Sequence, residues 1–170
     1  DEVGKGSWLG SPNCQKLMAQ SNGEIKTVED LKFYFVKKAS AILQQKNIAL
    51  AGWEDGLMFN ATTPFERKLL PNKRIIANVW DNIWEWGVAD RAYRLANANY
   101  QVVLAHATHL YFDHPQEVSS EQRGYYWATR YSDAKKVFGY MPDDIYANAD
   151  KTRMGNPIVD LQALVGRPLP

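Results

Sequence analysis

The sequence predicts an α/β fold in which helices cover a parallel sheet. Segments with helical periodicity alternate along the chain with short apolar segments. The short segments are apolar at nearly every position rather than at every second one, which is typical of strands buried on both faces of a parallel sheet. The 170 residues, 45% hydrophobic and 23% charged, have the length and composition of one ordinary globular domain.

The first part of the chain predicts a loop followed by a helix. Glycine, proline and asparagine are frequent in residues 3–26, which predicts a long irregular loop. Thr27 is suited to cap a helix because acidic residues follow it in the first turn. Apolar residues at helical spacing then predict an amphipathic helix over 27–46.

Three strands are predicted after this helix. The apolar runs at 48–53, 74–80 and 100–105 have the length and composition of buried strands. The segment 87–99 carries apolar residues on one helical face, so it predicts a helix between the second and third strands.

The last part of the chain carries weaker patterns. Ser119 or Ser120 would cap a helix over 121–131, and a turn is expected at 133–138. Prolines, glycines and asparagines are spread over residues 139–170, which are therefore expected to be mostly loop.

Composition and charge exclude several classes of protein. The net charge is +1, from 20 Lys and Arg against 19 Asp and Glu, which offers no electrostatic argument for nucleic acid or an anionic membrane. No apolar run approaches the roughly 20 residues of a spanning helix, so we predict neither a nucleic-acid partner nor a membrane span. Cys14 is the only cysteine, which excludes a disulfide scaffold. Because the sequence begins with Asp1 and Glu2 rather than Met, we also expect the chain to be part of a longer protein.

Aromatic and acidic residues follow each predicted strand. Functional groups gather at the carboxyl ends of strands in parallel sheets, so these residues predict one shared pocket. They are Trp53, Glu54 and Asp55 after the first strand, Trp80, Asp81 and Asn82 after the second, and His106, His109, Tyr111 and Asp113 after the third.

These residue types suit a carbohydrate better than a phosphate. Trp faces stack on the apolar faces of sugar rings, and carboxylates bind hydroxyl groups or act as general acids and bases. No glycine-rich cradle with Lys or Arg follows a strand, and Cys14 has no visible base. His106, His109 and His114 lack the spacing of a zinc site and are interpreted as structural, so we predict no metal and no other cofactor.

Five motifs in order resemble the catalytic domain of family 20 glycoside hydrolases, the β-N-acetylhexosaminidases of the bacterial chitobiase type. The resemblance runs from residue 1 to about residue 150. The motifs are Asp1-Glu2-Val-Gly-Lys-Gly-Ser-Trp8, Gly52-Trp-Glu-Asp-Gly-Leu57, Asn78-Val-Trp-Asp81, Leu110-Tyr-Phe-Asp113 and Arg123-Gly-Tyr-Tyr-Trp127.

The resemblance implies part of a (β/α)₈ TIM barrel. Residues 1–170 would be a C-terminal portion of the catalytic domain, from the end of the fourth strand through the seventh strand and the loops that follow it. An upstream arginine that holds the sugar, and a Trp-x-Glu segment after the last strand, have no match in this chain. The resemblance also suggests a periplasmic or secreted location.

The resemblance implies hydrolysis of terminal β-linked N-acetylhexosamine (GlcNAc or GalNAc) by a retaining, substrate-assisted mechanism. Glu2 would protonate the glycosidic oxygen and then act as base toward water. Asp1 would accept the acetamide N–H, and Tyr111 would donate its hydroxyl to the acetamide oxygen. We expect two adjacent carboxylates to perform two tasks when their environments separate their pKa values.

Four further residues are implied to bind the substrate. Trp53 and Trp80 would form the walls of an apolar box around the acetamide methyl group. Asp113 would bind a sugar hydroxyl, most simply that of O6. Trp127 would stack on the next sugar, beyond the bond that is cleaved.

The sequence leaves one alternative open, a non-catalytic carbohydrate-binding module. Such a module would explain the Trp and Asp residues equally well but has no need for a general acid such as Glu2. We also expect the isolated chain to be inactive. Its partners would be the carbohydrate substrate, the missing half of the barrel and, through open strand edges, a second copy of itself.

Overall fold

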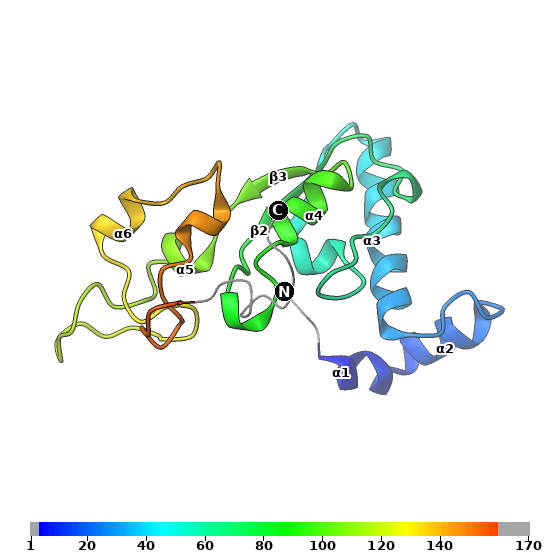
Figure 1. Ribbon diagram of the computed structural model, residues 1–170. Coiled ribbons are helices and arrows are strands. Elements are labelled where there is room, and N and C mark those ends of the chain that lie inside the picture. Colours follow the sequence, from blue (N-terminus) through cyan, green and yellow to red (C-terminus); the bar gives the residue numbers. More distant parts are fainter. Residues whose placement is uncertain (1–3, 160–170) are drawn as a thin grey trace. The chain divides into compact units, whose positions relative to one another are not determined.

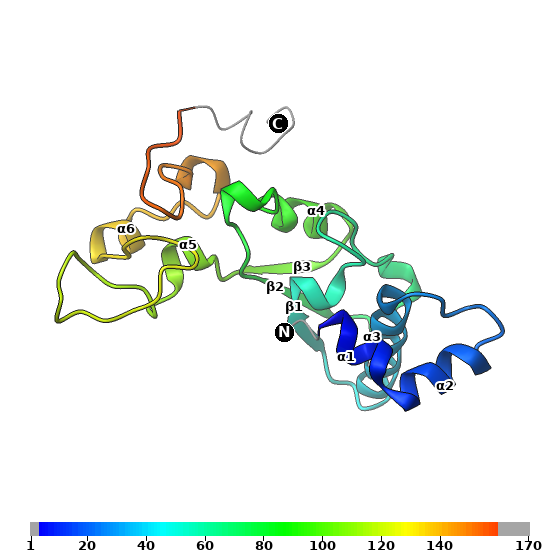
Figure 2. The same cartoon turned by 90° about the horizontal axis from the view of Figure 1, so that it is seen from below.

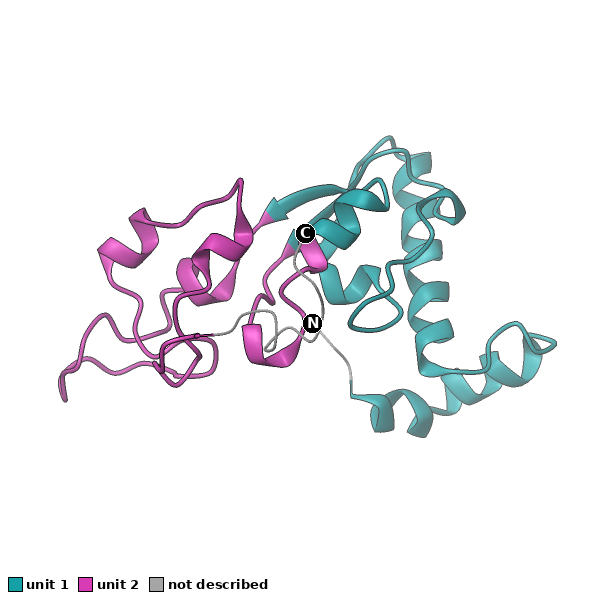
Figure 3. Ribbon diagram, viewed as in Figure 1, with its two compact units in different colours: residues 1–78, 93–103 teal, residues 79–92, 104–170 magenta. Residues whose placement is uncertain are grey.

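The computed structural model describes residues 4–159, and the chain divides into two compact units (Figure 3). Unit 1 contains residues up to 78 together with 93–103, and unit 2 contains residues 79–92 together with those from 104 onward. No helix in the described part of the chain is both long and apolar enough to cross a membrane.

Three strands form one sheet in the order β1-β2-β3 (Figure 2), of which Figure 1 labels β2 and β3. Their bounds are Leu50–Trp53 for β1, Ile75–Val79 for β2 and Gln101–Leu104 for β3. The first two strands run parallel, with Leu50 opposite Ile75 and Trp53 opposite Asn78. The prediction of an α/β fold with a parallel sheet is therefore confirmed.

Only the central strand is as buried as the apolar runs predicted. In β2 buried and half-buried positions alternate, whereas β1 and β3 alternate between half-buried and exposed positions. Among the described residues β2 alone has a strand on both sides, which explains the difference. Full burial of all three strands was therefore a wrong expectation for this part of the chain.

Helix α3 (Val28–Gln45) covers the segment predicted as the first helix. The Thr27 hydroxyl accepts a hydrogen bond from the Asp30 N–H at 3.1 Å, and the Asp30 carboxylate accepts one from the Thr27 N–H at 2.9 Å. This reciprocal pair is a capping box, which satisfies backbone groups that a helix start leaves unpaired. The Lys26 N–H also donates to the Asp30 carboxylate, at 2.9 Å, and this bond, followed by those of the Thr27 hydroxyl and N–H, holds the pKa of Asp30 below its usual value.

Asn72 connects the starts of the first two strands within unit 1. Its side-chain amide donates to the Ile48 carbonyl at 2.8 Å, and its side-chain oxygen accepts from the Arg74 N–H at 2.9 Å. Its own N–H donates to the buried Ser40 hydroxyl of α3 at 2.9 Å. One buried side chain thus fixes the entry into both β1 and β2.

The first 26 residues differ from the predicted loop. They form α1 (Lys5–Gly10) and α2 (Pro12–Gln20). Pro12 occupies the first helical position, where its missing N–H costs nothing. Neither helix contains a buried residue, so no apolar stripe marks them in the sequence. An ion pair of 2.7 Å between Lys5 and Glu29 links α1 to α3.

Two further predicted helices differ from what the structure shows. The helix predicted at 87–99 is shorter, α4 (Arg91–Asn97), because Gly87 adopts a left-handed φ of 68° before it. The helix predicted over 121–131 is absent, and that segment is irregular. The turn expected at 133–138 is instead α6 (Ala134–Phe138), which Asp133 caps by accepting from the Lys136 N–H at 2.7 Å.

Short elements complete the described residues. Helix α5 (Ala107–Leu110) follows β3 directly. Within residues 139–159 the one helical turn is η4 (Ile145–Asn148). The remaining 3₁₀ turns are η1 (Glu54–Leu57), η2 (Arg67–Leu69) and η3 (Trp84–Trp86).

Candidate active site

The residues of the candidate site fall into three groups. Asp1 and Glu2 lie outside the described residues. Trp53 lies in unit 1, at the end of β1. The remaining four, Trp80, Tyr111, Asp113 and Trp127, all lie in unit 2.

Backbone hydrogen bonds join the end of β2 to the chain that leaves β3. The N–H of Ala105 donates to the Val79 carbonyl at 2.8 Å, and the N–H of Ala107 donates to the Trp80 carbonyl at 2.9 Å. The second bond continues the strand pairing beyond the strands themselves. It sets Trp80 beside the start of α5, the helix that leads to Tyr111.

A buried side-chain pair strengthens this junction. The Asn82 amide donates to the Thr108 hydroxyl at 2.8 Å, and the Thr108 N–H donates to the Asn82 side-chain oxygen at 3.2 Å. The Thr108 hydroxyl also lies 2.8 Å from Nδ1 of His109. All three side chains are buried. The loss of Asn82 or Thr108 would therefore leave a buried polar group unsatisfied.

Trp127 is the centre of an aromatic cluster in unit 2. Its ring centroid lies 5.7 Å from that of Trp80, 5.6 Å from that of Tyr111 and 5.4 Å from that of His114. Trp80, Tyr111 and Trp127 pack on a small buried core made by Ile83, Ala107 and Ala128. Three predicted site residues, Trp80, Tyr111 and Trp127, therefore meet in one place. His114, the neighbour of Asp113, joins them there.

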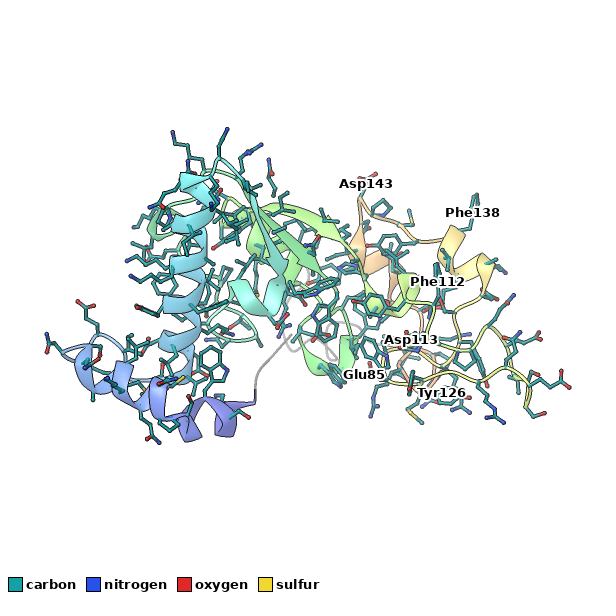
Figure 4. All side chains as sticks on the ribbon, turned by 180° about the vertical axis from the view of Figure 1, so that it is seen from behind. Glu85, Phe112, Asp113, Tyr126, Phe138 and Asp143 are labelled. Atoms are coloured by element: carbon teal, nitrogen blue, oxygen red, sulfur yellow. The ribbon has the colours of Figure 1, made fainter. Side chains whose placement is uncertain are left out.

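Asp113, which is labelled in Figure 4, contacts this cluster through its carboxylate. Its Oδ2 accepts a hydrogen bond from Nε1 of Trp127 at 2.8 Å. Its Oδ1 lies 3.7 Å from Nε2 of His114, and the Asp113 side chain is 38% exposed. His114 is itself held by a 2.8 Å contact between its Nδ1 and the Tyr125 carbonyl. An aromatic surface and a partly exposed carboxylate thus lie side by side, which is a suitable arrangement for a sugar.

A close backbone crossing brings Asp113 and Trp127 together although they are 14 residues apart. The Tyr125 N–H donates to the Asp113 carbonyl at 2.8 Å. At Gly124 an added Cβ would lie 2.7 Å from the Asp113 carbonyl oxygen and 2.7 Å from the Pro115 nitrogen. Glycine is therefore required where the two segments cross.

Trp53 presents 38% of its surface at the end of β1, opposite Asn78 of β2. The Asn78 amide donates to the Gly52 carbonyl at 3.3 Å, beside this ring. The residues that follow, Glu54 and Asp55, are buried in η1, and Lys32 of α3 donates to the Asp55 carbonyl at 2.8 Å. The local structure therefore anchors the backbone on both sides of Trp53 while its ring remains accessible.

Two histidines that follow β3, His106 and His109, are buried. His106 is fully buried, and the Tyr140 hydroxyl lies 2.8 Å from its Nδ1. Burial, together with a smaller contribution from the neighbouring His109, lowers the pKa of His106 to about 4. Burial likewise lowers the pKa of His109 to about 4, with Lys136 contributing. In residues 4–159 no group of three or more His, Cys, Asp or Glu side chains is arranged to hold a metal ion.

Several residues that build this site were not predicted from the sequence. Asn82 and His114 were noted only for their place in the chain, and Thr108 and Gly124 were not singled out. Asn82 offered a signal, because it follows a strand directly. The role of Gly124 depends on a contact with a distant segment, so no local pattern marks it.

The comparison of the sequence with known protein families identifies the family of the chain. Residues 1–163 match the family described as glycosyl hydrolase family 20, catalytic domain. The chain belongs to this family, whose catalytic domain is of the TIM-barrel type.

Three bacterial relatives show how much of such a protein the chain represents. It is 39% identical to a beta-hexosaminidase of Vibrio vulnificus over 90% of the chain and 18% of that protein. It is 35% identical to beta-hexosaminidase B of Pseudoalteromonas piscicida over 84% of the chain and 17% of that protein. It is 32% identical to N,N'-diacetylchitobiase of Vibrio harveyi over 86% of the chain and 16% of that protein. The chain thus spans less than a fifth of the length of these relatives.

We predict that Gly124→Ala destabilises unit 2 by about 1–3 kcal/mol, because the added methyl group overlaps backbone atoms that have no room to move. Urea unfolding of the complete protein, followed by near-ultraviolet circular dichroism, measures this change. The matched control is Gly6→Ala in α1, where an added Cβ meets nothing within 4 Å. Equal unfolding curves for the two variants would contradict the crossing described above.

Proposed function

We propose that the complete protein removes terminal β-linked N-acetylhexosamine from chitooligosaccharides or glycoconjugates, with retention of configuration. Family membership and the names of the relatives support this class of reaction. The observation that carries the proposal is the cluster in unit 2, where Trp80, Tyr111 and Trp127 surround a small core and Asp113 lies at its edge.

The proposed reaction uses the substrate's own acetamide group as the nucleophile. The acetamide oxygen attacks C1 while the glycosidic C–O bond breaks, and Glu2 gives its proton to the leaving oxygen. The product of this step is an oxazolinium ion. Water then attacks C1 while the bond between C1 and the acetamide oxygen breaks and restores the acetamide. Glu2 takes a proton from that water, and the sugar leaves with its original β configuration.

Two residues would control the acetamide group during the attack. The Asp1 carboxylate would accept the acetamide N–H and stabilise the positive charge that develops on the ring of the intermediate. The Tyr111 hydroxyl would donate to the acetamide oxygen and orient it toward C1. The packing of Tyr111 on the buried core, with its ring centroid 5.6 Å from that of Trp127, supports this role because it restrains the ring.

The tryptophans would exclude water from the intermediate. Trp80 and Trp53 would enclose the acetamide methyl group, and Trp127 would stack on the sugar that leaves. The half-buried rings of Trp80 and Trp127 support this assignment, because a fully buried ring would have no face for a ligand. Asp113, with its partly exposed carboxylate, would bind a hydroxyl group of the terminal sugar. The sheet β1-β2-β3 would supply the fifth, sixth and seventh strands of the barrel.

Retention of configuration is the first test of this function. The complete protein is incubated with a chromogenic β-N-acetylglucosaminide, and proton NMR identifies the anomer that forms first. We expect the β anomer, because two successive inversions at C1 restore the original configuration. Initial formation of the α anomer would reject the mechanism. Tight sugar binding without any turnover would instead favour a carbohydrate-binding module.

The role of Glu2 is tested by varying the leaving group. We expect Glu2→Gln to reduce kcat/KM by about 100-fold or more for a substrate with a poor leaving group, and much less for an activated aryl glycoside. A good leaving group needs little protonation in the transition state, so it depends less on the acid. An equal loss for both substrates would show that Glu2 is not the general acid.

We further propose that residues 1–170 alone are inactive. Strands β1 and β3 are the outer strands of the described sheet, and open strand edges favour association between chains. Light scattering measures the mass of the purified piece, and the chromogenic substrate measures its activity. A monomer with the turnover of the complete protein would contradict this proposal.

A further inference from the structure

The two oxygens of the Asp113 carboxylate have different surroundings. Oδ2 accepts the indole N–H of Trp127 at 2.8 Å. Oδ1 lies 3.7 Å from Nε2 of His114, which is beyond hydrogen-bond distance. One oxygen is therefore committed to the protein, while the partly exposed side chain leaves the other within reach of a ligand.

The indole of Trp127 is restrained by three ring contacts and by one directional hydrogen bond. The rings of Trp80 and Tyr111 stand at 66° and 73° to it, and that of His114 at 49°. All three rings thus contact the indole edge to face or at a tilt, and none stacks parallel to it. A hydrogen bond to a carboxylate is directional and about twice as strong as one between neutral groups. The Asp113 carboxylate supplies such a restraint at one edge of the ring.

Hydrogen bonds to Tyr125 fix the position of Asp113 and of the next residue. Its carbonyl accepts the Tyr125 N–H at 2.8 Å, and the next residue, His114, is buried and held at Nδ1 by the Tyr125 carbonyl at 2.8 Å. The segment that carries the carboxylate is thus bonded to the segment that carries Trp127. Because Asp113 is held in place in this way, its carboxylate can orient the indole.

We propose that Asp113 is a positioning residue for Trp127 and that it thereby sets the preference for a leaving group that is itself a sugar. The proposal rests on the function proposed above. Through Oδ2 the carboxylate holds the indole at the tilt that a leaving-group sugar requires. Asp113 then serves two subsites at once, because Oδ1 can still bind a hydroxyl group of the terminal sugar.

A double-mutant cycle in the complete protein separates the two roles. The variants are Asp113→Ala, Trp127→Phe and the double variant. The substrates are N,N'-diacetylchitobiose, whose leaving group is a sugar, and β-N-acetylglucosaminyl fluoride, whose leaving group has no ring. Loss of a contact to the terminal sugar affects both substrates alike, whereas misplacement of Trp127 affects the disaccharide alone.

We expect Asp113→Ala to lower kcat/KM for the disaccharide about tenfold more than for the fluoride. Trp127→Phe should also lower kcat/KM for the disaccharide about tenfold less in the Asp113→Ala variant than in the wild-type protein. The reason is that the indole is already misplaced in that variant. Additive losses on the disaccharide, or equal losses on both substrates, would overturn the proposal.

The conservative variant and a spectroscopic measurement complete the test. Asp113→Asn keeps a side-chain oxygen for the indole N–H, so it should recover most of the preference for the disaccharide. If Asp113→Ala fails to fold, Asp113→Leu, which has nearly the size of aspartate but no hydrogen-bond acceptor, takes its place in the cycle with the same expectation. In protein labelled with ¹⁵N-tryptophan, Asp113→Ala should shift the Trp127 indole N–H resonance strongly, and Asp113→Asn should shift it less.

The outcomes distinguish this proposal from the function on which it rests. If the wild-type protein cleaves neither substrate, the proposed function fails. The indole resonance then still decides whether Asp113 holds Trp127. If the protein cleaves both substrates and the indole resonance is unchanged in Asp113→Ala, the function stands and the positioning role is wrong.

Discussion

The junction between Trp80 and Ala107 is the constraint on which the candidate site depends. A single backbone hydrogen bond, 2.9 Å long, sets the residue after β2 beside the start of α5. The buried Asn82–Thr108 pair holds the same two segments together by their side chains. Trp80 and Tyr111 come from segments about 30 residues apart, and this junction is what allows both to pack on one small core.

Much of the fold in unit 1 could be predicted because its signals are local. Thr27 and Asp30 mark the start of α3, and the apolar runs mark β1 and β2 to within a few residues. Helices α1 and α2 were missed for the opposite reason. They bury no side chain, so they lack the apolar stripe from which a helix is recognised.

Four residues of the candidate site were named from the sequence, whereas the contacts between them were not predicted. Trp80, Tyr111, Asp113 and Trp127 were selected from motifs, and unit 2 brings them together. The segment that contains Trp127 was expected to be helical and is not. Its path depends on the crossing at Gly124, a contact between distant segments that no periodicity encodes. The bond between Trp127 and Asp113 follows from that path and could not be foreseen.

The crossing at Gly124 also has a consequence for how such a site can vary. Asp113 and Pro115 meet Gly124 and Tyr125 at one point, so the intervening residues 116–123 form a loop whose two ends are tied together. Insertions, deletions and substitutions in a surface loop of this kind cost little when its ends stay in place. The residues beside the cluster can therefore diversify between relatives, and be exchanged by design, while the aromatic cluster keeps its geometry.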